Sequence, residues 1–140
     1  MQLKTKAAWA SPMMESFPEC PGSYSFLIKL EAPHTITVGN LGTFALSSGY
    51  YVYSGSAKNG LANRLTRYFT RGQKKLHWHI DYLLAVAYPL GYYISTDRGE
   101  CELNKMFAEK KGAKVVVEGF GCTDCSCKTH LIYFSRVPIL

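Results

Sequence analysis

The sequence of 140 residues has no apolar run near the ~20 residues that a membrane-spanning helix requires. Residues 1–20 carry lysines but lack the continuous apolar segment of a signal peptide, which predicts a cytoplasmic protein. Internal repeats, low-complexity tracts and interdomain linkers are also absent. We therefore expect one globular domain over residues 21–140, preceded by a poorly specified leader over residues 1–20.

Acidic residues are scarce relative to basic ones, and cysteines do not occur in an even number. Ten Asp and Glu against 16 Lys and Arg give a net charge of +6, which favours a polyanionic partner. Because many basic proteins reach this charge, the positions of the basic residues say more than their total. The five cysteines exclude a complete disulfide framework and predict free thiols in a reducing compartment.

Short segments rich in β-branched and aromatic residues, bounded by Gly, Pro and Asn, predict strands. These strands are expected over residues 24–30, 35–38, 43–46, 50–53, 90–94, 115–117 and 131–134. The second and third of them should form a hairpin. The run of three valines at 115–117 predicts a short buried strand.

Helical spacing of apolar residues predicts helices over residues 60–71 and 78–87, the second ended by Pro89. A third helix should be capped by Thr96 or Asp97 and run to about Lys111 before Gly112. Together these elements predict a small single α+β domain, with a central mostly antiparallel or mixed sheet flanked by helices.

Two tripeptides, Gly22-Ser23-Tyr24 and Tyr53-Ser54-Gly55, bracket the expected hairpin and are followed by Arg64 on a helix. This order puts two phenolic hydroxyls on neighbouring strands and a guanidinium one element away. An arginine binds phosphate through two parallel hydrogen bonds, and a tyrosine beside it can act as a base once cations stabilise its phenolate. The alternative is that these tyrosines only alternate on a strand between a packed and an exposed face.

The same motifs, with Ala57-Lys58-Asn59, resemble the GIY-YIG nuclease superfamily, over roughly residues 20–135. The segments LHWHIDYL (76–83) and GFGCTDCSCKTH (119–130) are similar to an uncharacterised prokaryotic branch, sometimes fused to endonuclease III-type glycosylases. The middle residue of each tripeptide is Ser rather than aliphatic, and Ser56 stands where many relatives carry a basic residue. Either departure is compatible with an altered mechanism or with lost catalysis.

The resemblance implies hydrolysis of a phosphodiester bond with one divalent metal, Mg²⁺ or Mn²⁺. When the family's roles are assigned to the matching positions of this sequence, Tyr53 is the general base, Tyr24 its supporting partner and Arg64 the phosphate clamp. Tyr68 stands where the family often has Tyr or His. His130 falls in the second family-like segment and is a candidate for the cleft.

The metal-binding glutamate that the resemblance implies is either Glu100 or Glu102. Glu100 shares a helical face with Leu103 and Phe107, so it should point inward, whereas Glu102 projects about 200° away. We favour Glu100 and keep Glu102 as the alternate. Both carboxylates could instead serve only to complement the helix dipole.

Basic residues recur on one face of the helix that begins near residue 60. Arg64, Arg67, Arg71 and Lys75 are spaced by three, four and four residues, so they form one stripe if the helix continues. Lys58 and Lys74 extend it. With Tyr68, this set predicts contacts to a nucleic-acid backbone, DNA above all, although a solvated helix face has the same pattern.

Four metal-ligand side chains fall within nine residues: Cys122, Cys125, Cys127 and His130. Thiolates and imidazole are the ligands of structural zinc, but converging from one short loop is sterically awkward. His77 and His79 could complete a site instead, although capping and core packing explain them equally well. Buried structural thiols remain the competing interpretation of the cysteines.

These observations favour a metal-dependent endonuclease that acts on DNA, in repair and in association with a repair glycosylase. The first alternative is a non-catalytic nucleic-acid-binding module on the same fold. A zinc-stabilised protein-interaction domain is the second.

Overall fold

A computed structural model describes residues 9–10, 20–58, 60–69, 76, 78–122, 125 and 127–140. Its elements are β1 (Gly22–Leu30), β2 (His34–Val38), β3 (Gly42–Leu46), β4 (Gly49–Ala57), α1 (Leu61–Phe69), α2 (His79–Leu84), β5 (Tyr88–Ser95), α3 (Glu100–Ala108), β6 (Lys114–Val115) and β7 (Leu131–Phe134). The predicted α+β class is confirmed. No helix in these ranges is long and apolar enough to cross a membrane.

The main sheet has five strands in the order β5-β1-β4-β7-β6, and every pair in it is antiparallel. The two central strands are β1 and β4, whose register places Tyr24 opposite Gly55 and Phe26 opposite Tyr53. The expected hairpin is confirmed as β2 and β3, which form a separate two-stranded sheet. The two tripeptides therefore lie on neighbouring strands, as the sequence predicts.

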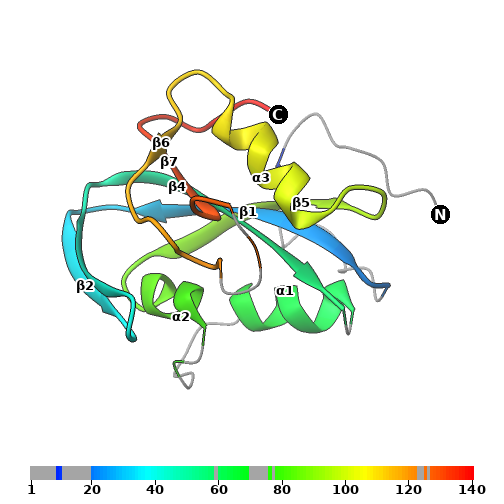
Figure 1. The fold of residues 1–140 in the computed structure, drawn as a ribbon, viewed down its shortest axis with the longest axis horizontal. Coiled ribbons are helices and arrows are strands. Elements are labelled where there is room, and N and C mark those ends of the chain that lie inside the picture. Colours follow the sequence, from blue (N-terminus) through cyan, green and yellow to red (C-terminus); the bar gives the residue numbers. More distant parts are fainter. Residues whose placement is uncertain are drawn as a thin grey trace.

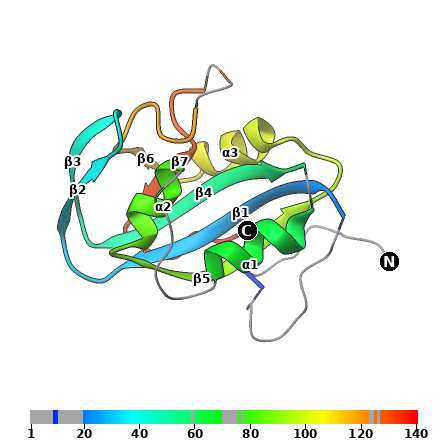
Figure 2. The ribbon, with the colours of Figure 1, turned by 90° about the horizontal axis from the view of Figure 1, so that it is seen from below.

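Helices cover both faces of the main sheet. Figure 1 shows α3 on one side of the sheet and α1 and α2 on the other, and Figure 2, from below, shows α1 in front of β1 and β5. Alternate side chains of the central strands serve the two faces. Tyr24, Phe26 and Tyr53 pack with α1 and α2 in the larger core, whereas Leu27 and Val52 pack with α3 in the smaller one.

Two residues of the expected leader contact this domain. The Trp9 ring stacks on Phe107 of α3 at a centroid distance of 5.4 Å, and its indole N–H donates to the carbonyl of Pro138 at 3.0 Å. Ala10 exchanges backbone hydrogen bonds with Tyr92 of β5. This part of the chain thus adds apolar contacts to the α3 face.

Two predicted helix limits are wrong. The helix expected over 78–87 ends at Leu84, because the chain enters edge strand β5 at Tyr88 and Pro89 is tolerated at a sheet edge. The third helix is capped by Gly99, not by Thr96 or Asp97. The Asp97 carboxylate accepts a hydrogen bond of 2.7 Å from Ser95 Oγ, which stabilises a turn before the helix begins.

The valine run is the third correction. Only Lys114 and Val115 pair with β7, as edge strand β6, and Val115 and Val116 are exposed. Val117 turns inward after the strand and joins the larger core. An edge strand is covered on fewer sides than a central one, so its β-branched residues do not guarantee burial.

Candidate active site

A pocket of about 330 Å³ opens beside β4, near the point where its ladder with β7 stops at Tyr53. Its walls come from both central strands, α1, the first turn of α3 and the segment before β7. The lining residues are Tyr24, Tyr53, Gly55, Ser56, Lys58, Arg64, Trp78, Glu100, Gly121 and Cys125. Four of the five expected catalytic residues line this pocket, and the fifth, His130, is buried beneath Glu100.

Three tyrosines meet at the pocket floor. The hydroxyls of Tyr24 and Tyr68 share a hydrogen bond of 2.7 Å, and the ring of Tyr53 lies 6.4 Å from that of Tyr24. Burial raises the pKa of both Tyr24 and Tyr53 well above the ordinary value, and the Arg64 guanidinium opposes this rise. Both side chains are therefore phenols at neutral pH until further positive charge approaches.

Two glycines make room for these hydroxyls. A Cβ at Gly55 would overlap the Tyr24 hydroxyl, which explains why the second tripeptide needs glycine opposite Tyr24. A Cβ at Gly121 would lie 2.9 Å from the Tyr53 ring, and Gly121 also has a positive φ of 72°. The backbone thus needs glycine at these two positions, because it passes so close to the tyrosine side chains.

Arg64 reaches the pocket from α1. Its Nη1 donates to the carbonyl of Ser56 at 3.3 Å, and its guanidinium lies 4.4 Å from the centre of the Trp78 ring. The aromatic face and the carbonyl fix the guanidinium plane without neutralising its charge. Arg64 is therefore held ready to receive an anion in the pocket.

Glu100 opens α3 and points into the same pocket. Its Oε1 accepts a hydrogen bond from Ser56 Oγ at 3.3 Å, and its Oε2 lies 3.4 Å from His130 Nδ1. The hydrogen bond with His130 is the main cause of a lowered pKa, so the carboxylate stays ionised. Glu102 is exposed and lies outside the pocket lining, so the preference for Glu100 agrees with the geometry.

The pocket suits a divalent cation that binds oxygen. Mg²⁺ keeps several of its waters and needs only one or two carboxylates from the protein. Glu100 offers an ionised carboxylate, and the hydroxyls of Ser56 and Tyr53 lie in the same pocket. These residues could hold a hydrated Mg²⁺ or Mn²⁺.

Arg67 has a structural role that its spacing does not predict. Its Nη2 forms a 2.8 Å ion pair with Asp81, whose side chain is only 1% exposed. The guanidinium also lies 4.8 Å from the Trp78 ring, on which Arg64 packs as well. Asp81 accepts a further hydrogen bond from the Trp78 backbone at the start of α2. Arg67 thus joins α1 to α2.

We expect Arg67→Ala to lower the free energy of unfolding by about 2 to 3 kcal/mol, because Asp81 would stay buried without its cation. Urea unfolding followed by circular dichroism measures the change. The control is Lys58→Ala, an exposed lysine, which should change stability by less than about 0.5 kcal/mol. Equal stability of the two variants would show that the ion pair contributes nothing.

The other expected nucleic-acid contacts divide into three groups. Lys58 is exposed and lines the pocket rim, where a phosphate could reach it. Tyr68 is buried, so it supports Tyr24 from below and is not open to a nucleic-acid backbone. Arg71, Lys74, Lys75 and also His77 lie outside the described residues. His79 accepts a hydrogen bond from the Gly121 amide at 2.8 Å, which agrees with a structural role.

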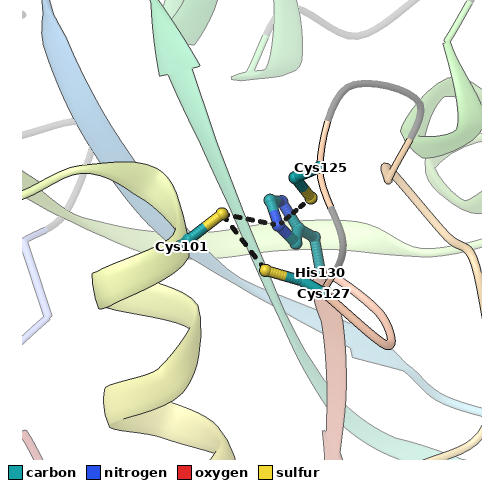
Figure 3. Close-up of side chains that lie close together, drawn as sticks. All are labelled: Cys101, Cys125, Cys127 and His130. Carbon is teal, nitrogen blue, oxygen red and sulfur yellow. Dashed lines mark hydrogen bonds between the residues drawn. The ribbon is translucent and has the colours of Figure 1, made fainter.

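A second cluster of ligand side chains lies beside the pocket, but its membership differs from the predicted one. Cys101, Cys125, Cys127 and His130 bring their ligand atoms within 4.8 Å of one another and could hold a metal ion (Figure 3). Cys122, the fourth predicted ligand, is not in this group and donates its thiol hydrogen to the Phe120 carbonyl at 3.4 Å. Cys101, from the first turn of α3, takes the place of Cys122 in the cluster.

Three residues of this region were missed by sequence reasoning. Cys101 stands alone in the sequence, and only its position next to Glu100 could have drawn attention to it. Trp78 packs against both Arg64 and Arg67, a role that no motif indicates. Ser56 counts as a lost basic residue in the sequence, yet it donates a hydrogen bond to Glu100.

Comparison with known proteins identifies a family without assigning an activity. The family described as "Domain of unknown function DUF123" matches residues 23–139. No curated protein and no solved structure matches the chain. The match includes the whole lining of the pocket and the Cys/His cluster.

Proposed function

We propose that this chain, which belongs to the DUF123 family of domains of unknown function, is a metal-dependent endonuclease of the GIY-YIG type that acts on DNA. One observation carries the proposal. Tyr24, Tyr53, Arg64 and Glu100 come from four separate elements and line a single pocket. A base, a cation that binds phosphate and an ionised carboxylate are the groups that phosphodiester hydrolysis needs.

In this proposal each side chain has one task. Arg64 binds two oxygens of the scissile phosphate, because its planar guanidinium offers paired N–H donors and Trp78 already holds its plane. Tyr53, once deprotonated to its phenolate, takes the proton of the attacking water and becomes a phenol again. Tyr24, bonded to Tyr68, supports the base from beneath. Glu100 holds the divalent cation, which when bound supplies positive charge to the phosphate and to a phenolate.

The remaining expectations follow from the same proposal. The net charge of +6 and the exposed Lys58 favour a nucleic-acid backbone as the partner. We place the enzyme in the cytoplasm and in DNA repair, associated with a repair glycosylase. The cofactor of the pocket is Mg²⁺ or Mn²⁺.

The alternative function is a non-catalytic module that binds nucleic acid on the same fold. It is favoured by the burial that raises the pKa of both tyrosines and makes a phenolate costly. In that case the pocket would bind phosphate through Arg64 without cleaving the phosphodiester bond.

The purified chain should therefore be tested on labelled duplex, flap, junction and RNA substrates, with Mg²⁺, Mn²⁺ or chelator. We expect nicking of at least one DNA substrate. The nicking should require the divalent ion and be lost on chelation, because the ion held by Glu100 supplies the positive charge that the phosphate and the Tyr53 phenolate need. Salt-dependent binding without cleavage of any substrate would support the non-catalytic module. An absence of both would contradict a nucleic-acid function altogether.

A further inference from the structure

We propose that the chain binds one zinc ion through a site that joins α3 to the segment before β7, with the ligands Cys101, Cys125, Cys127 and His130. The site differs from the compact loop site that the sequence spacing suggests, because one thiolate comes from a helix. Zinc binding does not depend on the proposed nuclease activity. A second consequence, that the ion fixes Glu100 in the pocket, does rest on the proposed function.

The four ligand atoms all lie within 4.8 Å of one another, which is close enough for one zinc ion to draw them into a tetrahedral site. Zn–S bonds of about 2.3 Å and Zn–N bonds of about 2.0 Å place ligand atoms about 3.5 to 3.8 Å apart. In the structure Cys101 Sγ lies 3.1 Å from Cys127 Sγ and 3.7 Å from His130 Nε2. Cys125 Sγ lies 3.3 Å from the same Nε2. The three sulfur atoms surround the ring nitrogen, as Figure 3 shows.

The hydrogen bonds of His130 leave the correct nitrogen available. Its Nδ1 lies 3.1 Å from the carbonyl oxygen of Ser54 and 3.4 Å from Glu100 Oε2. Both partners are acceptors, so Nδ1 carries a proton and Nε2 is the ring nitrogen that remains for a metal ion. Nε2 faces the sulfur atoms of Cys101 and Cys125. A zinc-bound histidine whose other nitrogen donates to a carbonyl or carboxylate is the usual arrangement in metal sites.

Near Cys101 and His130, hydrogen bonds that do not depend on an ion hold the backbone in place. His130 donates its amide hydrogen to Phe120 at 2.8 Å and accepts from the Ser54 amide at 3.1 Å. Asn104, one turn beyond Cys101 on α3, donates to the Thr129 carbonyl at 2.7 Å. The helix and the segment before β7 are thus already held together where the ligands meet, which lowers the entropic cost of forming the site.

The site also borders the proposed active site. Cys101 follows Glu100 directly, and Cys125 lines the pocket. Zinc on His130 Nε2 would hold the Nδ1 hydrogen toward Ser54 and Glu100, and zinc on Cys101 would fix the first turn of α3. His130 and Cys101 are then positioning residues for Glu100, and neither touches the substrate.

Thiol alkylation mapped by mass spectrometry tests the site on the unchanged chain. Binding displaces the thiol protons of the three cysteine ligands, so zinc should slow their alkylation and a chelator should restore it. The other two cysteines are built-in controls, because Cys20 is exposed and Cys122 lies outside the ligand group. Their rates should not change with zinc. Protection of Cys122 in place of Cys101, or no protection by zinc, would overturn the proposal.

Metal content measured on matched variants gives an independent result. We expect about one zinc per chain in the wild type and in Cys122→Ser. Cys101→Ser should lose more than the 10- to 100-fold in zinc affinity that a change outside the ligand shell costs. The opposite ranking of these variants would assign the metal to the compact loop set. A Cys101–Cys127 disulfide that forms even under reducing conditions with zinc supplied would also exclude the site.

The effect on Glu100 is read separately. Removing zinc should raise the Mg²⁺ or Mn²⁺ concentration that gives half-maximal nicking. DNA affinity should stay within about twofold, because Arg64 lies on α1 and Lys58 follows β4, away from α3. Unchanged metal dependence with zinc removed would leave a zinc site that does not position Glu100. A zinc-loaded chain that never nicks would instead contradict the proposed function and leave the zinc site standing.

Discussion

Glu100→Gln should reduce divalent-metal-dependent nicking by on the order of 10³-fold. Glutamine keeps the length of the side chain and can still accept the hydrogen bond from Ser56, but it carries no charge to hold the cation. DNA affinity measured without metal should stay near wild type. Nicking rates at saturating substrate, over a range of Mn²⁺ concentrations, measure the effect.

Glu102→Gln is the matched control, because the same change is made two residues away on the exposed side of α3. It should alter the rate by less than about twofold, in line with a surface substitution. The reverse ranking would mean that Glu102 is the ligand and that the pocket geometry misleads. Equal and near-complete activity of both variants would remove the carboxylate from the mechanism.

Most strands could be located because their sequence signals are local. Residues 131–134 form β7 with the limits expected, and the hairpin is found at the expected place. β-branched and aromatic residues between glycines and prolines specify such strands without help from distant contacts. The elements that were misplaced depend on context. Pro89 ends no helix here, because the edge of the sheet accepts it.

The candidate site was only partly within reach of the sequence. The tyrosines and Arg64 belong to short motifs, and helical spacing was enough to predict that Glu100 points inward. Arg67 shows the limit of that reasoning. Spacing along one helix identifies a shared face, but it cannot tell whether a residue on that face pairs with another element, as Arg67 does with Asp81 of α2. The same limit hid Cys101, whose partners lie at least 24 residues further along the chain.

Tyr53→Phe should lower the nicking rate at saturating substrate by about 10²- to 10⁴-fold, the usual contribution of a general base. The substitution deletes the hydroxyl and keeps the ring that packs on Phe26 and Phe120, so folding and DNA affinity should stay near wild type. Tyr133→Phe is the matched control, because its hydroxyl bonds to Ser48, away from the pocket. It should nick at the wild-type rate.

The pH dependence separates a base from a group that only binds. Burial raises the pKa of Tyr53, and a base acts in its deprotonated form, so the wild-type rate should rise with pH by about tenfold per unit through the neutral range. This rise should be absent from the residual activity of Tyr53→Phe. Tyr24→Phe should keep the rise and lose less rate, because Tyr24 supports the base through its contacts with Tyr68. If Tyr24→Phe abolishes the pH dependence and Tyr53→Phe preserves it, the two tyrosines exchange roles while the pocket keeps its function.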